Sequence, residues 1–198
     1  MIFQPVLYVI GYLLSALSII LCIPAGVDAF YGDNQWQSFT FASLISLFFG
    51  IILILANKSD DLSINLKQAF LLTTLSWVFI AIFGSLPFIF SNLELSFTDA
   101  FFESMSGITT TGSTILSGLD NLPHGILIWR SLLQWIGGIG IIVIAISFLP
   151  VLKVGGMQLF HTESADSSEK VLPRAAQIAS IIGIIYFVLT MLCALLLW

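Results

Sequence analysis

The chain has 198 residues, of which 58% are hydrophobic and 9% are charged, and its formal net charge is −5. A soluble domain carries about 25% charged residues, so this composition excludes a soluble enzyme, a nucleic-acid-binding protein and a secreted disulfide-stabilised domain. Cys22 and Cys193 lie inside apolar stretches without the spacing of a metal site, which favours a packing role for both thiols.

Five stretches of the chain contain no charged residue: 1–27, 34–57, 68–93, 131–152 and 175–198. Crossing the hydrocarbon core of a bilayer takes roughly 20 mainly apolar residues, and each stretch is long enough. The sequence therefore predicts an all-α membrane protein with several membrane-spanning helices.

The basic residues predict the orientation of these helices. Five of the six Lys and Arg residues fall in the loops of one side, namely Lys58, Lys67, Lys153, Lys170 and Arg174. The loops of the other side are acidic, with Arg130 as their basic residue. Short loops rich in Lys and Arg stay in the cytoplasm. We therefore expect a cytoplasmic amino terminus and an outer position for residues 94–130.

The outer segment begins with the pattern of a short helix. Apolar residues recur at helical spacing within residues 96–107, and Ser96 or Thr98 can cap the amino-terminal end. Asp99 lies in the first turn, where the helix dipole favours an anion. A helix of about ten residues is about 15 Å long, which is half the thickness of a membrane core.

A threonine-rich segment, T-T-T-G-S-T at residues 109–114, follows this half-helix. Extended threonines, with Gly112 free to adopt a positive φ, can turn successive carbonyl oxygens toward one axis. A ring of such carbonyls can replace the hydration shell of an alkali cation, and the half-helix directs its negative carbonyl end toward the same place. The pattern predicts a re-entrant pore loop. A structured external loop is the alternative, because clusters of Ser, Thr and Gly are usually plain loops.

Charged residues near this loop allow more than one interpretation. Arg130 can form an ion pair with Glu103 or Asp99, or it can extend to the membrane interface at the start of a span. Glu103 follows Asp99 by one helical turn, so the two carboxylates share a helix face. We expect them to support the filter or attract cations.

Three glycines, Gly137, Gly138 and Gly140, interrupt the fourth apolar stretch. They predict either a hinge or close packing between helices. Trp36 and Trp129 lie near expected outer ends of spans and predict interface anchors. His124 follows Pro123 and is expected to be an exposed loop residue.

Several long motifs occur together in residues 85–160: SLPF (85–88), TDAFFESMSGITTTGST (98–114), GLDNLPHGI (118–126), WRSLLQWIGGIGIIVIAISFLPVL (129–152) and GGMQLF (155–160). With them the chain resembles the Trk/Ktr/HKT superfamily of potassium transporters, most closely the bacterial Trk membrane subunit. The resemblance implies uptake of potassium, bound by the backbone carbonyls of Thr110 and Thr111, with Thr109 and Gly112 flanking them. It implies no cofactor other than the transported potassium ion.

The resemblance also implies the domain organisation. Residues 1–66 would form two leading transmembrane helices, and 67–152 the first helix–pore loop–helix unit. Residues 153–173 would form a cytoplasmic loop, and 174–198 the first helix of a second, truncated unit. The superfamily builds its pore from four such units in one chain, whereas this sequence contains a single T-x-G filter segment. It would therefore supply one quarter of the pore.

The partners implied by the resemblance are the lipid bilayer of the bacterial inner membrane, a second copy of the full-length form and a cytoplasmic nucleotide-binding regulatory subunit. No nucleic acid is expected. The chain has no G-x-G-x-x-G or P-loop motif of its own, so a nucleotide site would belong to the regulatory subunit.

Two other functions compete with this prediction. An intramembrane enzyme would use Asp99, Glu103 and His124 as acid–base groups, which requires them to converge on one cavity. An accessory membrane subunit would contain no pore of its own.

Overall fold

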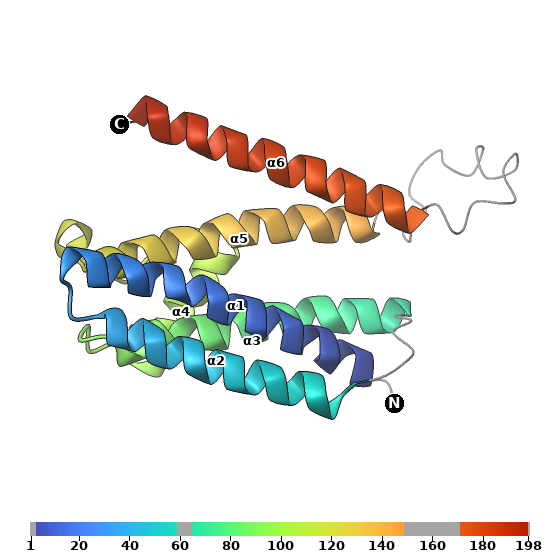
Figure 1. Cartoon of the computed structure of the whole chain (residues 1–198), viewed down its shortest axis with the longest axis horizontal. Helices are drawn as coiled ribbons and strands as arrows, with labels where there is room; N and C mark the ends of the chain where they lie inside the picture. Colours follow the sequence, from blue (N-terminus) through green and yellow to red (C-terminus); the bar gives the residue numbers. More distant parts are fainter. Residues whose placement is uncertain (1–2, 59–64, 149–170, 198) are drawn as a thin grey trace, which may run out of the picture. The chain divides into compact units, whose positions relative to one another are not determined.

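The structure, a computed structural model, describes residues 3–58, 65–148 and 171–197. The regular elements within these ranges are helices, as the sequence predicted (Figure 1). The elements are α1 (Gln4–Tyr31), α2 (Trp36–Ala56), α3 (Leu66–Phe90), α4 (Phe97–Ile108), the 3₁₀ turn η1 (Leu119–Asn121), α5 (His124–Phe148) and α6 (Val171–Leu197). In the described part, α1, α2, α3 and α6 are long and apolar enough to cross a membrane. The chain is therefore a multi-pass membrane protein.

Local signals set the ends of the first three helices. Pro5 lies in the first turn of α1, where its missing N–H has no intrahelical partner to lose. The same helix ends at Gly32, whose φ of 79° is the left-handed conformation typical of a helix carboxyl end. Asn65 caps α3, and Gln68 bonds back to the Asn65 N–H in a reciprocal capping box.

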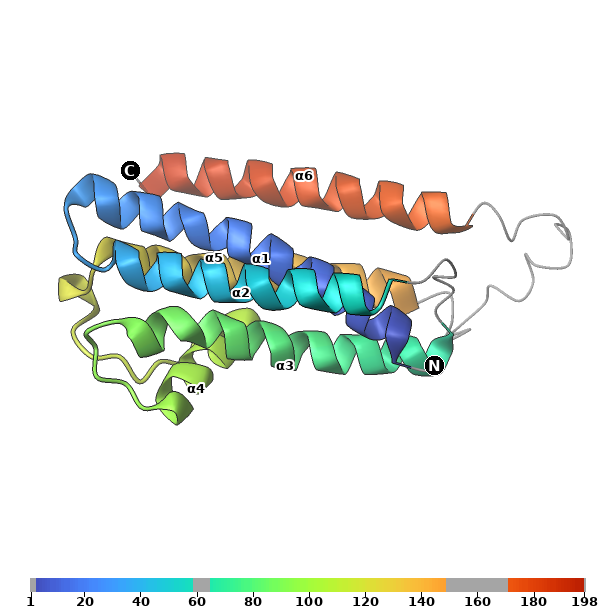
Figure 2. The ribbon, with the colours of Figure 1, turned by 60° about the horizontal axis from the view of Figure 1, so that its bottom comes forward.

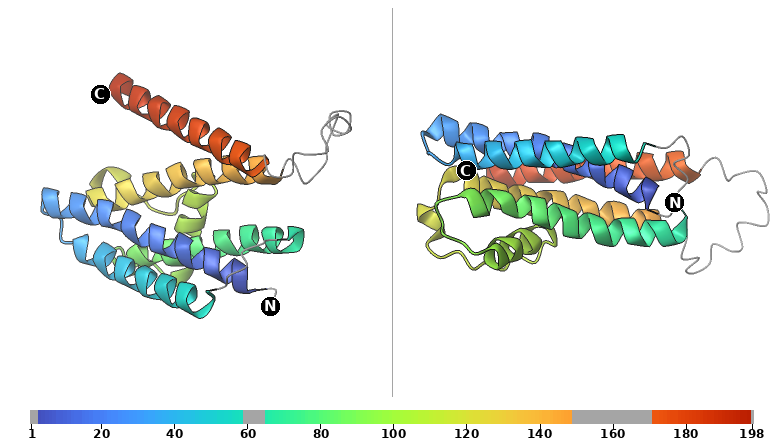
Figure 3. Two further views of the ribbon diagram at one scale, coloured as in Figure 1. Left: turned by 45° about the vertical axis from the view of Figure 1, so that its right-hand side comes forward. Right: turned by 90° about the horizontal axis from the view of Figure 1, so that it is seen from below.

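Residues 1–137 and 138–198 form two compact units, which we describe separately. In the first unit, α1 and α2 are antiparallel neighbours and α3 packs against both of them, as Figures 2 and 3 show. The short helix α4 packs against α3 near the end where α1 and α2 join. The first half of α5 completes this unit.

Small residues allow α1 and α2 to approach closely. A Cβ added to Gly11 would lie 2.8 Å from the Gly50 carbonyl oxygen, and one added to Gly50 would lie 2.5 Å from Ser15 Oγ. Ser43 donates a hydrogen bond of 2.7 Å from α2 to the Ser18 carbonyl of α1. Close contact through glycine and serine is the usual way in which membrane helices associate, because lipid provides no hydrophobic drive between them.

The prediction that Trp129 anchors α5 at the membrane interface is wrong. The Trp129 side chain is fully buried, and its Nε1 donates a hydrogen bond of 2.9 Å to the carbonyl of Gly84 in α3. A buried indole usually finds such a partner for its N–H. Trp129 therefore joins α5 to α3 inside the first unit, whereas Trp36 is 42% exposed at the start of α2.

In the second unit, α5 meets α6 at Gly138. A Cβ added to Gly138 would lie 2.6 Å from the hydroxyl oxygen of Tyr186 in α6. Helix α6 begins at Val171, earlier than the expected boundary at 174. The expected cytoplasmic loop lies, through residue 170, outside the described residues.

Candidate functional site

Helix α4 is the half-membrane helix that the sequence predicts. Ser96 caps it, because its Oγ accepts the Asp99 N–H at 3.2 Å and donates to the Asp99 carboxylate at 2.7 Å. Its twelve residues correspond to about 18 Å. One face, with Glu103 and Ser106, is buried, whereas Phe97 and Phe102 are exposed. The carboxyl end at Ile108 leads directly into the threonine segment.

The backbone after α4 turns its N–H groups back toward the helix end. The N–H of Thr110 bonds to the Gly107 carbonyl at 2.9 Å, and the N–H of Thr111 bonds to the Ser106 carbonyl at 3.0 Å. Thr110 and Gly112 both have a positive φ, at 60° and 76°. A positive φ is unfavourable for a β-branched residue such as Thr110, and it marks a conformation that the surroundings impose.

Unlike these N–H groups, the carbonyl oxygens at the start of the threonine segment are not hydrogen-bonded within the described part of the chain. Among the described residues, no hydrogen bond reaches the carbonyl oxygens of residues 109–112. Thr110, Thr111 and Gly112 are also exposed. By contrast, the next carbonyl, that of Ser113, accepts a bond of 2.6 Å from Ser106 Oγ. The carbonyl oxygens of residues 109–112 therefore have no hydrogen-bond partner among the described residues.

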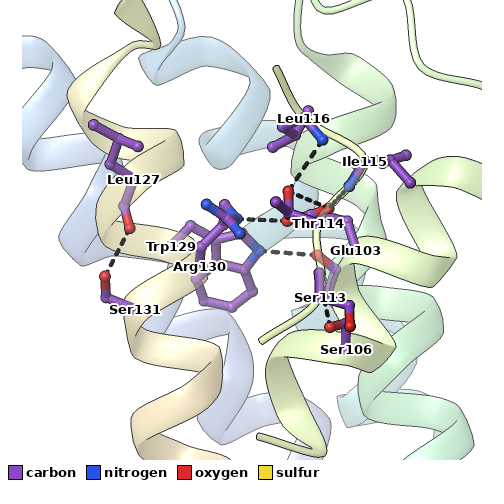
Figure 4. A network of polar contacts seen from close by, with 11 residues as sticks. Glu103, Ser106, Ser113, Thr114, Ile115, Leu116, Leu127, Trp129, Arg130 and Ser131 are labelled. Atoms are coloured by element: carbon purple, nitrogen blue, oxygen red, sulfur yellow. Dashed lines mark hydrogen bonds and ion pairs between the residues drawn. The ribbon is translucent and has the colours of Figure 1, made fainter. Parts of the chain in front are cut away.

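Glu103 ties the chain that follows the threonine segment to α4 and α5 (Figure 4). Its carboxylate accepts bonds of 3.0 Å from Thr114 Oγ1 and 3.2 Å from the Ile115 N–H. Arg130 Nε donates to the same carboxylate, and the Glu103 and Arg130 side chains are 1% and 15% exposed. Of the partners considered for Arg130, the structure places Glu103 against it. Asp99 is bonded to Ser96 instead.

Glycines bring α4 into close contact with its neighbours. A Cβ on Gly107 would lie 3.0 Å from Leu133 of α5, and one on Gly84 of α3 would lie 2.6 Å from Ser104 Oγ. A Cβ on Gly137 would overlap the Ile108 carbonyl at the end of α4. In the described part, α5 continues as a helix through Gly137, Gly138 and Gly140, and Gly140 has open space around it. Gly137 therefore serves close packing in this structure, and the hinge stays a prediction.

Comparison with known proteins bears directly on this arrangement. Residues 35–198 match the family model of TrkH, described as a cation transport protein. The chain belongs to the TrkH family. It is 43% identical over 99% of its length to the Trk system potassium uptake protein TrkH of Escherichia coli K12, covering 41% of that protein. It is 44% identical to the Trk system potassium uptake protein TrkI of Halomonas elongata over 96% of this chain and 39% of that protein.

A solved structure agrees with the family membership. The crystal structure of the potassium transporter TrkH from Vibrio parahaemolyticus superposes with a TM-score of 0.86 at 38% sequence identity. The match covers 100% of this chain and 40% of that one. The chain thus spans about two fifths of the length of the relatives that it matches.

The contacts of His124 in this TrkH-family chain were not predicted from the sequence. His124 is exposed, as predicted, but it is the first residue of α5 and does not lie in a loop. Its Nδ1 lies 2.8 Å from Asp33 Oδ2, its backbone N–H bonds to the same oxygen at 3.2 Å, and its ring stacks on Tyr31 with centroids 4.2 Å apart. The ring hydrogen bond, followed by the backbone one, lowers the pKa of Asp33 below its ordinary value. The bonded carboxylate therefore persists at neutral pH and is lost only as the pH falls through that lowered pKa.

The groups required by the enzyme hypothesis do not converge in the described part of the chain. Glu103 pairs with Arg130, Asp99 with Ser96 and His124 with Asp33. A groove of about 590 Å³ opens elsewhere, between α2 and the end of α3, and its lining has no ionisable side chain: Asn34, Gln35, Gln37, Ser38, Phe41, Ile45, Phe90 and Asn92. This geometry gives no support to acid–base catalysis.

Proposed function

We propose that this chain supplies one quarter of a potassium-selective uptake pore, with the carbonyl oxygens of Thr110 and Thr111 as ion ligands and Thr109 and Gly112 flanking them. The observation that carries the proposal is that the backbone N–H groups and the backbone carbonyl oxygens after α4 differ in their hydrogen bonding. The N–H groups bond to the helix end, whereas the carbonyl oxygens of 109–112 are unpaired among described residues. Unpaired carbonyls at membrane depth are tolerated where they line an aqueous path.

The charges around the segment suit a cation. Helix α4 ends at Ile108, so the negative end of its dipole lies beside the proposed ligands. The guanidinium of Arg130 would repel a cation, but Glu103 neutralises it. We therefore assign Glu103 and Arg130 to support of the filter.

The names of the relatives support the choice of ion, since two of them are Trk system potassium uptake proteins. The finer assignments follow from the resemblance and belong to the same proposal. They are a bacterial inner-membrane location, a homodimer of the full-length form and a cytoplasmic nucleotide-binding regulatory subunit.

The proposal is tested by ion flux through the natural full-length protein in lipid vesicles. We expect uptake of a rubidium tracer that external potassium inhibits and that equal external sodium leaves nearly unchanged. Empty vesicles provide the baseline. A purified protein that folds but shows no flux would favour the accessory-subunit alternative, and equal inhibition by sodium would contradict a potassium-selective filter.

Cysteine labelling tests the proposed orientation, in a background where serine replaces Cys22 and Cys193. Ser117, an exposed residue between α4 and α5, should react as Ser117→Cys with an impermeant thiol reagent added outside intact cells. Lys58, exposed just after α2, should react as Lys58→Cys only after the cells are opened. The basic loops predict this result, and the reverse labelling pattern would overturn the orientation.

A further inference from the structure

Asp28 lies at a position that is unfavourable for its own helix. It belongs to the last turn of α1, where the negative end of the helix dipole repels an anion, and that turn contains no basic residue. The side chain is nevertheless fully buried. A buried carboxylate at such a place requires compensation from another element.

The compensation comes from the amino-terminal end of α5. Asp28 Oδ1 accepts a hydrogen bond from the backbone N–H of Gly125, in the first turn of that helix. There the dipole favours an anion, so Asp28 serves α5 as a cap although it belongs to α1. Gly125 permits the contact, because the atoms nearest to an added Cβ would all belong to the Asp28 carboxyl group.

A second contact, a few residues further along the chain, reinforces the first. The turn at Gly32 brings Asp33 back, its N–H bonding to the Asp28 carbonyl at 2.8 Å. The Asp33 carboxylate then accepts the backbone N–H of His124 at 3.2 Å. Two carboxylates from one leading helix and its turn thus bond to consecutive N–H groups at the start of α5.

We propose that Asp28 is a positioning residue for the ion filter, acting through α5. The connection is short: Asp28 holds Gly125, and fewer than two helical turns later Arg130 bonds to Glu103. Glu103 in turn bonds to Thr114 and Ile115, which follow Gly112 and Ser113 after the proposed ion ligands. Helix α1 and the turn after it thereby set the position of the threonine segment. This inference rests on the proposed function.

The test is the potassium-over-sodium preference of the full-length protein in vesicles, compared between two glycine variants. Gly125→Ala displaces Asp28 from the helix end and should lower the preference by about fivefold, the scale of losing one helix cap. Gly26→Ala is the matched control: Gly26 lies in α1, and a Cβ there meets no atom within 4 Å. The control should keep the wild-type preference.

Two further variants separate positioning from folding. Asp28→Ala should lower the preference as Gly125→Ala does, whereas Asp28→Asn, which keeps an acceptor oxygen, should lie between Asp28→Ala and wild type. The double variant Asp28→Ala/Gly125→Ala removes the steric overlap between the Cβ added at position 125 and the Asp28 carboxyl group. It should recover any purified yield lost in Gly125→Ala, while its preference stays low.

The outcomes distinguish this inference from the function on which it rests. A wild-type protein without potassium preference would overturn the proposed function and this inference with it. A selective wild type whose preference survives Asp28→Ala and Gly125→Ala would overturn the positioning role alone. Lower yield with unchanged preference would likewise reduce Asp28 to a residue needed only for folding.

Discussion

Replacing Glu103 with alanine is expected to lower the unfolding free energy by about 3–5 kcal/mol, the range for removing one partner of a buried ion pair. The Glu103 side chain is 1% exposed, and its loss would leave Arg130 without a counter-charge in a largely buried position. It would also remove the acceptor for the Thr114 hydroxyl and the Ile115 N–H. Reversible unfolding in mixed detergent would measure the change.

The matched control is Asp120→Asn, which removes an exposed carboxylate from the 3₁₀ turn η1 between α4 and α5. It should change the unfolding free energy by no more than about 0.5 kcal/mol. Glu103→Gln combined with Arg130→Gln removes both charges and should be less destabilised than the sum of the two single variants. Strict additivity would show that the two side chains do not interact, contrary to their contact in the structure.

Features that are local in the sequence could be predicted from it. Charge-free stretches correspond to long helices because a membrane span requires consecutive apolar residues. The half-helix was also predictable, since Ser96, Asp99 and the apolar spacing all lie within a few residues of one another. Its carboxyl end is Ile108, one residue beyond the expected segment, and Gly107 lies in the last turn of α4 against Leu133.

Contacts between distant residues could not be predicted in the same way. Asp28 and Gly125 are 97 positions apart, and hydropathy does not say which helix end an acid will meet. The one available signal was an acid in the last turn of an apolar helix without a basic neighbour. Trp129 illustrates the same limit, because an indole near a span end fits the interface and the interior equally well until its neighbours are known.

The two partners considered for Arg130 differ in a way that the structure explains. Asp99 and Glu103 share a helix face, but Asp99 lies in the first turn of α4, where Ser96 and the helix end hold it. Glu103 lies one turn deeper and is buried, so an ion pair there also satisfies a carboxylate that would otherwise be costly. Burial, which spacing alone does not reveal, separates the two acids.

Replacing Gly112 with serine is expected to impair selectivity before stability. Gly112 has a φ of 76°, and the nearest atom to an added Cβ is Gln134 Nε2 at 4.0 Å. A side chain therefore has room, and the cost is that of holding a residue with a Cβ in the left-handed region, about 1 kcal/mol. Relaxation of that backbone would rotate the neighbouring carbonyls, so sodium should compete better for rubidium uptake while purified yield stays near wild type.

Gly118→Ser provides the control for this backbone effect. Gly118 has a similar φ of 66° and no atom within 4 Å of an added Cβ, but it lies in the turn before η1. Both variants should lose a similar, small amount of thermal stability, because both carry the same conformational cost. Only Gly112→Ser should change the ion preference, because only its carbonyl neighbours are proposed to bind the ion. Equal potassium preference in the two variants would show that the left-handed turn at Gly112 shapes the loop without forming a filter.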